Sequence, residues 1–211
     1  MGYVRDVFQQ RHMEKLIGNY GIGHVRYPTA GGNGKEFAQP MYVNSPYGIS
    51  LAHNGNLTNA KQLSNELFHA EMRHLQTDSD SEVLLNIFAH ELAKQREIYP
   101  DAKNIFKAVS KTHIRCDGAY AVIALITGHG LIAFRDNNGI RPLSIGIRKG
   151  KTRDEYVVAS EDALFSSLGF SKLRDVDPGE AVFIDKNGQF FSQQCADNPQ
   201  NRPCIFEYVY F

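Results

Sequence analysis

A strand-like stretch, GISLAHNGNLTN over residues 48–59, ends in a glycine that lies between two asparagines. Asn-Gly is the strongest short signal for a hairpin turn, so a plain turn is one interpretation of Asn54-Gly55. The other interpretation is a binding site, because a glycine lets the backbone approach a ligand and an Asn amide adds a second N–H donor. Two donors aimed at one point form an oxyanion hole, which stabilises the negative charge that develops in acyl transfer. The dipeptide alone leaves both interpretations open.

Three further polar residues occupy expected strand ends, glycine-rich loops or helix starts: Arg26, Thr29 and Asp80. An Arg guanidinium can bind a carboxylate through two parallel hydrogen bonds, and an Asp carboxylate pairs with an ammonium group. Together with an oxyanion hole, these groups would hold an α-amino acid by both charged ends and polarise its side-chain carbonyl. That is the chemistry of a glutamine amide site. Each residue also has a structural interpretation, since Arg26 suits a strand end, Thr29 a turn and Asp80 a helix N-cap.

Other polar residues near these positions have simpler interpretations. His24 and His53 are adjacent to the same loops, and we interpret both as structural. Asp136 and Arg141 flank the turn sequence NNG and are most simply an ion pair across a hairpin. None of these four residues is needed for the expected site.

Hydrophobic periodicity predicts the elements that must position the site. Helical spacing is expected at residues 7–17, 58–75, 79–95, 102–112 and 161–170. Strands are expected at residues 21–27, 47–53, 119–126, 131–136, 140–148, 156–160, 180–185 and 189–195. Ser79 or Asp80 suits the N-cap of the helix that follows. Tight turns between short strands, with most helices grouped apart from them, predict an α+β fold with antiparallel sheets.

The composition suits one domain that spans residues 1–211, with 42% hydrophobic and 22% charged residues. Lys+Arg and Asp+Glu both number 23, so no basic excess indicates binding to nucleic acid or to an anionic membrane. No apolar run approaches the roughly 18 residues of a membrane span, and the polar start does not read as a secretory signal. The cysteines are too few and too dispersed for a disulfide framework or a metal cluster, which indicates a cytoplasmic protein with reduced thiols: Cys116, Cys195 and Cys204.

Five motifs follow one another along the chain: HVRYPTAGG, LAHNGNL, TDSDSE, AFRDNNGIRPL and PCIFEYVYF. In this order they resemble the glutaminase domain of the amidophosphoribosyltransferase family, and the resemblance covers essentially all 211 residues. HNGNL and RDNNGIRPL resemble class II glutamine amidotransferases in general, whereas RYPTAGG and FEYVYF narrow the resemblance to the purine enzymes. Five ordered motifs rarely coincide by chance.

The resemblance implies an Ntn-hydrolase fold, which is a four-layer αββα sandwich of two antiparallel sheets. It implies that Arg26 binds the α-carboxylate of glutamine with Thr29 beside it, and that Asp80 binds the α-amino group. The Asn54 side chain and the Gly55 backbone N–H would form the oxyanion hole. The parent enzyme would hydrolyse glutamine and use the ammonia to convert phosphoribosyl pyrophosphate to 5-phosphoribosylamine, the first committed step of purine synthesis.

The sequence departs from the family at both ends. The family's nucleophile is an N-terminal cysteine whose own α-amine serves as the base, whereas this sequence begins Met-Gly-Tyr-Val. We therefore expect the first strands and the catalytic cysteine to be missing and the chain alone to be inactive. The phosphoribosyltransferase domain, with its phosphoribosyl pyrophosphate and Mg²⁺, is expected to be absent, and a homo-oligomer is expected of the full-length enzyme. No cofactor is expected in this chain, because Cys204 alone cannot hold an iron–sulfur cluster.

Two other functions stay open. A domain that binds glutamine or a partner protein without catalysis would also retain Arg26, Asn54 and Asp80. Another class II amidotransferase, such as an enzyme that aminates a sugar, would share the central motifs. Turnover of glutamine would separate the first alternative from the enzyme, and the identity of the ammonia acceptor would separate the second.

Overall fold

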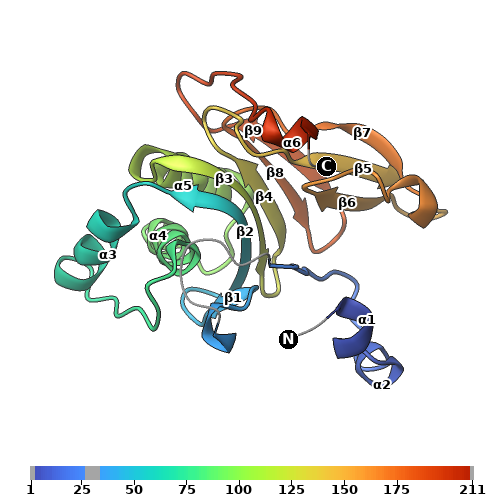
Figure 1. Ribbon diagram of the computed structural model, residues 1–211, viewed down its shortest axis with the longest axis horizontal. Coiled ribbons are helices and arrows are strands. Elements are labelled where there is room, and N and C mark those ends of the chain that lie inside the picture. Colours follow the sequence, from blue (N-terminus) through green and yellow to red (C-terminus); the bar gives the residue numbers. More distant parts are fainter. Residues whose placement is uncertain (1–2, 27–33, 210–211) are drawn as a thin grey trace.

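The computed structural model describes residues 3–26 and 34–209, which contain two antiparallel sheets (Figure 1). The six-stranded sheet has the order β1-β2-β3-β4-β8-β9, and the three-stranded sheet has the order β6-β5-β7. The strands are β1 (Met41–Val43), β2 (Ile49–Leu57), β3 (Gly118–Ile126), β4 (Gly130–Arg135), β5 (Ser144–Arg148), β6 (Glu155–Ala159), β7 (Ser171–Asp175), β8 (Glu180–Asp185) and β9 (Phe190–Gln194). The helices are α1 (Val4–Val7), α2 (Gln10–Met13), α3 (Ala60–His69), α4 (Asp80–Ala93), α5 (Ala102–Arg115) and α6 (Phe206–Val209), with 3₁₀ turns η1 (Lys35–Phe37) and η2 (Ser166–Leu168).

Helices α3, α4 and α5 form the layer beside the six-stranded sheet (Figure 1). The Ser79 side chain caps α4 by accepting a hydrogen bond from Ser81 N–H, so Ser79 and not Asp80 is the N-cap. Asp101 and Asn104 form a capping box at the start of α5. Helix α4 is buried on most of its surface because it packs against β1, β2, α3 and α5, whereas α3 and α5 are amphipathic.

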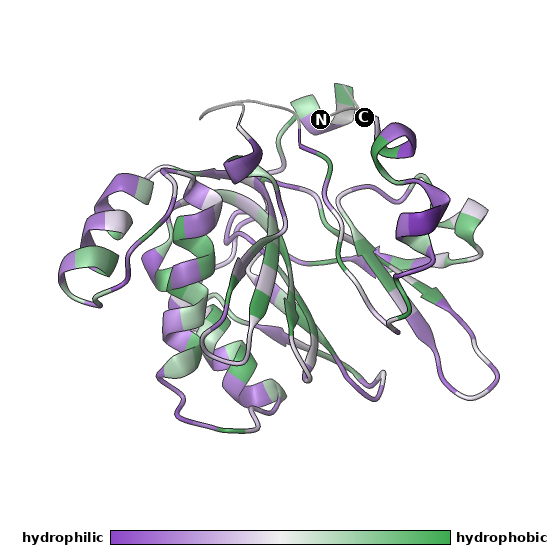
Figure 2. Cartoon of the chain, turned by 90° about the horizontal axis from the view of Figure 1, so that it is seen from below, coloured by the Kyte–Doolittle hydropathy of each residue, from purple (hydrophilic) through white to green (hydrophobic). Residues whose placement is uncertain are grey.

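The largest apolar cluster lies between the six-stranded sheet and its helices. A smaller apolar cluster lies between the two sheets and includes Ala121, Ala133, Ile145 and Val182. Gly146 leaves room on the other face of β5, where the ring of buried Phe165 lies 2.8 Å from the position that a Cβ would take. The outer layer of the three-stranded sheet is therefore formed by the segment around η2. Figure 2 shows apolar residues concentrated on the strands and on the helix surfaces that face them. The α+β class and the αββα arrangement expected from the sequence are confirmed.

The long β2–β3 pair lies in the middle of the fold. Its register runs from Ile49 opposite Ile126 to Leu57 opposite Gly118. The sequence pattern predicted a strand over residues 47–53, and the structure extends it through Leu57. Residues of the HNGN motif therefore lie inside a strand.

Several elements differ from the sequence-based expectation. Residues 21–26 form no strand, and the helix expected at residues 7–17 is replaced by the short helices α1 and α2. The helix expected over residues 161–170 reduces to η2, which Gly169 ends with a positive φ of 78°. The short strands β1 and β7 were not predicted. In α3, Leu63 and Leu67 are buried, whereas 53% of the surface of the neighbouring Phe68 is exposed.

Within the described ranges, no helix combines the length and the apolar character that crossing a bilayer requires. The same residues hold no group of three or more His, Cys, Asp or Glu side chains that could bind a metal ion.

Candidate functional site

Gly55 lies in an extended strand, where no other residue type fits. Its φ is +147°, a value that L side chains rarely adopt. A Cβ on Gly55 would lie 1.9 Å from the Ala119 carbonyl oxygen and 2.9 Å from His53 Nε2. The hairpin-turn interpretation of Asn54-Gly55 is therefore wrong, because both residues pair with β3 in an unbroken register.

The backbone of β2 has an open edge beyond the end of β1. In an antiparallel sheet, successive residues direct their N–H groups to opposite neighbours. Ile49 and Leu51 pair with β1, and β1 ends opposite Leu51. The next odd-numbered residues of β2 therefore direct their N–H groups toward an edge that no strand in residues 3–26 or 34–209 covers.

Side chains satisfy two of the three amides on this edge. His53 N–H donates to Gln39 Oε1 at 2.7 Å, and Leu57 N–H donates to Asp80 Oδ2 at 3.0 Å. Gly55 N–H lies between them on the same edge, and no group in residues 3–26 or 34–209 is recorded as accepting from it. This open N–H beside Asn54 is a preformed donor for an oxygen of a ligand.

Asn54 places its side chain beside the second sheet. Its Nδ2 donates to the Ser160 hydroxyl at 3.3 Å, and Ser160 directly follows β6. The Asn54 side chain and the Gly55 N–H are thus adjacent donors at the same end of the two sheets. Ser160 was not identified from the sequence, because nothing local in VVASED distinguishes it from an ordinary loop serine.

Asp80 is held at the same strand edge by the first turn of α4. One carboxylate oxygen accepts from Leu57 N–H, and none of the described residues is recorded as donating to the other, Oδ1. Asp80 therefore has one oxygen that fixes its position and a second that can bind a cation such as an ammonium group.

Arg26 lies at the end of the described N-terminal segment. Its guanidinium lies over the Phe37 ring, with 5.5 Å between Cζ and the ring centroid. No recorded contact joins it to Asn54, Gly55 or Asp80. Thr29 lies outside the described residues, so its predicted place beside Arg26 stays a prediction.

His53 lies on the helical side of β2 and is buried. Its Nδ1 lies 3.1 Å from Ser81 Oγ. Burial lowers the pKa of His53 to about 4, although the nearby Asp80 carboxylate acts in the opposite direction. The imidazole is therefore neutral at physiological pH.

Buried histidines should make the protein less stable in mild acid. Burial also lowers the pKa of His113, whose Nδ1 lies 2.8 Å from the Tyr120 hydroxyl, to about 4. Because the unfolded chain takes up these protons near pH 6.5 and the folded chain only near pH 4, stability is lost as the pH falls through this window. Each histidine contributes roughly 2 kcal/mol to the loss between pH 7.5 and pH 5, and roughly 3 kcal/mol once the pH is below 4. Urea unfolding at pH 7.5 and pH 5 should show the loss, and His113→Gln should reduce it by about half. An unchanged pH dependence in the variant would contradict the assignment.

Asp136 and Arg141 do not form the ion pair that the sequence suggested. The buried Asp136 carboxylate accepts hydrogen bonds from the backbone N–H groups of Tyr120, Asn138 and Ile140. Arg141 instead pairs with Glu207 near the C-terminal end of the described chain. Asp136 thus shapes the loop after β4, because backbone N–H groups compensate its charge without a cation.

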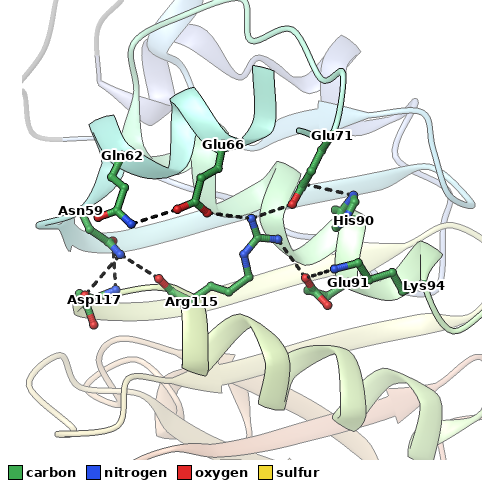
Figure 3. Close-up of polar contacts among 9 residues, drawn as sticks. All are labelled: Asn59, Gln62, Glu66, Glu71, His90, Glu91, Lys94, Arg115 and Asp117. Atoms are coloured by element: carbon green, nitrogen blue, oxygen red, sulfur yellow. Dashed lines mark hydrogen bonds and ion pairs between the residues drawn. The ribbon is translucent and has the colours of Figure 1, made fainter. Parts of the chain in front are cut away.

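A partly buried ion network braces the helix that carries Asp80 (Figure 3). The Arg115 guanidinium at the end of α5 lies 2.8 Å from Glu71, 2.9 Å from Glu91 and 3.4 Å from Glu66. Lys94 also pairs with Glu91, and His90 lies 3.2 Å from Glu71. The network joins α3, the segment after it, α4 and α5, so it fixes α4 relative to its neighbours.

The environments of the two buried cysteines do not suit a reactive thiol. Cys116 and Cys195 are buried, and burial raises their thiol pKa values to about 12 and about 11. Cys204 is partly exposed and lies before α6. A nucleophilic thiol needs a lowered pKa, so neither buried cysteine is suited to that role.

Two hollows open on the surface. One, of about 550 Å³, is lined by α3 and by the segment that leads to α4, including Phe68 and Arg73. It is also lined by Phe37 and Asp78, which lie two residues before Gln39 and Asp80. The other, of about 570 Å³, opens between β6 and the inner face of the six-stranded sheet at Ile123 and Leu131. Neither is lined by Asn54, Gly55 or Asp80, whose donors and acceptors meet at the strand edge.

Two facing antiparallel sheets, with helices α3, α4 and α5 over one outer face and the segment around η2 over the other, are the arrangement of the Ntn-hydrolase class. The glutamine amidotransferase domain family matches residues 30–167, and the chain belongs to that family. Curated relatives and solved structures also confirm the resemblance to amidophosphoribosyltransferases that the sequence motifs show.

The chain is 58% identical to the amidophosphoribosyltransferase of Pseudomonas aeruginosa over 209 residues, which are 99% of this chain and 42% of that protein. It is 59% identical to the Escherichia coli enzyme of the same name, with 100% of this chain and 42% of that protein aligned. The chain therefore spans about two fifths of the length of these relatives.

Solved structures agree with the sequence relatives. Glutamine phosphoribosylpyrophosphate amidotransferase from B. subtilis, complexed with ADP and GMP, superposes with a TM-score of 0.71 at 36% identity. The match covers 89% of this chain and 37% of that one. A structure described as the allosteric regulatory enzyme of purine biosynthesis gives a TM-score of 0.72 at 37% identity, with the same coverage of 89% and 37%.

Proposed function

We propose that the open edge of β2 binds the side-chain amide of glutamine, with Gly55 N–H and Asn54 Nδ2 as the oxyanion hole. One observation carries this proposal: of three successive amides on the edge, side chains satisfy the outer two, and no group in the described part of the chain accepts from the Gly55 N–H between them. When a nucleophile attacks the amide carbonyl, its oxygen becomes negative. Fixed N–H donors stabilise that charge without having to reorganise.

The charged ends of glutamine have complementary partners nearby. Asp80 Oδ1 would accept the α-ammonium group, because Oδ2 is already occupied by Leu57 N–H. Arg26 would bind the α-carboxylate in a forked arrangement, and Thr29 would lie beside it. These three assignments rest on chemical complementarity and on the family resemblance.

On this basis, the chain is the glutaminase part of an amidophosphoribosyltransferase of purine biosynthesis. The parent enzyme would release ammonia from glutamine and transfer it to phosphoribosyl pyrophosphate, which gives 5-phosphoribosylamine. Phosphoribosyl pyrophosphate and Mg²⁺ would bind to a phosphoribosyltransferase domain that lies outside this chain. The names of the relatives and the 42% coverage of their length support this division of labour. A cytoplasmic homo-oligomer is proposed for the complete enzyme.

A second candidate is glutamine binding without turnover by this chain alone. The observation that favours it is the state of the cysteines, since two are buried with raised pKa values and the third lies before α6. We therefore propose that the nucleophile of the complete enzyme is none of Cys116, Cys195 and Cys204. The chain should release no ammonia from glutamine at an enzymatic rate.

Calorimetric titration with L-glutamine tests the site in the 211-residue chain. Asp80→Asn should weaken binding about tenfold or more, because it removes a charge-assisted hydrogen bond to the ammonium group. Asp78→Asn, two residues earlier on an exposed side chain, is the matched control and should bind like the parent chain. Equal affinities of Asp80→Asn and the parent chain would exclude the proposed role of Asp80.

An ammonia-release assay tests the claim about the nucleophile. We expect the rate to stay at the background level, with or without single Ser substitutions of the three cysteines. Ammonia release that one of these substitutions abolishes would show that the cysteine concerned is the nucleophile.

A further inference from the structure

Gln39 joins the open edge of β2 to helix α4. It lies two residues before β1, and its side-chain amide takes the place that a longer β1 would occupy beside His53. Gln39 Oε1 accepts from His53 N–H at 2.7 Å, and Gln39 Nε2 donates to Ser81 Oγ at 3.1 Å. The amide orientation is unambiguous, because a backbone N–H can only donate and must face the carbonyl oxygen.

This orientation determines the direction of the next hydrogen bond. Ser81 Oγ accepts from Gln39, so its own hydrogen is available for His53 Nδ1, which lies 3.1 Å away. A neutral imidazole has one donor and one acceptor nitrogen. When Ser81 donates to Nδ1, the ring hydrogen is on Nε2, and the Ala119 carbonyl is the backbone acceptor that interacts with the ring.

His53 Nε2 lies against the backbone of Gly55. It is buried, the Ala119 carbonyl is its nearest backbone acceptor but does not meet ordinary hydrogen-bond geometry, and Nε2 lies 2.9 Å from the position that a Gly55 Cβ would take. The Ala119 carbonyl oxygen lies 1.9 Å from the same position. An N–H at Nε2 is attracted to that oxygen, whereas a bare lone pair would be repelled by it. The tautomer of His53 therefore determines whether Nε2 is attracted to or repelled by the Ala119 oxygen that lies beside the Gly55 backbone.

We propose that Gln39 is a positioning residue, which holds His53 in the Nε2–H tautomer through Ser81 and thereby keeps Gly55 N–H open on the edge of β2. This role rests on the proposed glutamine site, because it gives Gly55 N–H a ligand to bind. His24, Asp80 and Arg141 also act electrostatically on His53. Their charges affect whether the ring is protonated, whereas Gln39 and Ser81 determine which nitrogen of the neutral ring carries the hydrogen.

Nitrogen-15 NMR of the imidazole rings in the 211-residue chain at pH 7.5 tests the proposal. The parent chain should show His53 with a protonated Nε2 and a bare Nδ1. In Gln39→Glu the carboxylate only accepts, so Ser81 would donate to it and His53 Nδ1 would lose its donor. The His53 hydrogen should then move to Nδ1. Gln193→Glu, on an exposed residue of β9, makes the same chemical change far from this network and should leave the His53 signals unchanged.

A parent chain with the hydrogen on Nδ1 would overturn the proposal, as would a folded Gln39→Glu variant with an unchanged His53 tautomer. If Gln39→Glu does not fold, Ser81→Ala removes the same donor and should give a mixture of tautomers. An unchanged tautomer in Ser81→Ala would also overturn the proposal.

Glutamine titration separates this inference from the proposed function. Folded Gln39→Glu should bind L-glutamine about tenfold more weakly than the parent chain, a loss of the size expected for one misplaced hydrogen bond. If the parent chain shows the expected tautomer but binds no glutamine, the proposed glutamine site fails, and with it the functional role of Gln39. Unchanged glutamine binding with a changed tautomer would show that Gln39 orients the ring without positioning Gly55.

Discussion

Replacing Gly55 with alanine should destabilise the fold by at least about 3 kcal/mol and remove glutamine binding. An alanine at this φ of +147° is strained by about 1–3 kcal/mol, and its methyl group would lie 1.9 Å from the Ala119 carbonyl oxygen. The clash is with backbone in the central β2–β3 pair, so no side-chain rotation can relieve it. Urea unfolding and L-glutamine titration measure the two effects.

Gly128 provides the matched control for this substitution. Its φ is also positive, at +77°, but a Cβ there would meet no atom within 4 Å. Gly128→Ala should therefore cost only about 1–2 kcal/mol, the price of backbone strain alone. If Gly55→Ala were no more destabilising than Gly128→Ala, the strand at Gly55 would have to be less closely packed than the structure shows.

Replacing Arg115 with methionine should destabilise the protein by about 3–5 kcal/mol. Methionine keeps much of the side-chain volume, but it leaves Glu71 and Glu91 without the guanidinium that lies within 2.9 Å of both. Their side chains are 11% and 5% exposed, so water cannot replace the lost partner. Urea unfolding at pH 7.5 measures the loss, and Glu91→Gln in the same chain should restore part of it by removing a mostly buried charge whose remaining partner is the exposed Lys94.

The exposed Arg148–Glu155 pair is the control for Arg115. The two side chains are 46% and 48% exposed, so Arg148→Met should cost no more than about 1 kcal/mol. Similar losses in the two variants would mean that the Arg115 network is as well solvated as a surface pair. A larger loss in Arg115→Met would establish the network as the brace that holds α4, and hence Asp80, against its neighbours.

Local sequence patterns predicted most of the architecture. The helical periodicity of residues 79–95 and 102–112 and the apolar runs at residues 119–126 and 180–185 all became the expected elements. These segments are long or strongly patterned, so local preference and burial agree. The short strands β1 and β7 escaped prediction, because three to five residues carry too little pattern to distinguish a strand from a loop.

Long-range contacts decided the points on which the sequence-based interpretation was wrong. Asn-Gly favours a turn locally, but pairing along the whole of β2 and β3 holds Asn54 and Gly55 in a strand. Asp136 and Arg141 are close in sequence, yet backbone N–H groups surround the first and Glu207 pairs with the second. Sequence proximity could not show these competing partners.

The sequence by itself determined the family, the α+β class and the residue types that suit a glutamine site, because ordered motifs and periodicity are local properties. Only the tertiary structure decided which amide of β2 is left open. That outcome depends on where β1 stops and on two side chains that are distant in sequence, Gln39 and Asp80, which satisfy the neighbouring amides. Gly55 N–H is left as a donor because Gln39 and Asp80 accept from the amides on either side of it. These residues come together with β2 only when the chain folds.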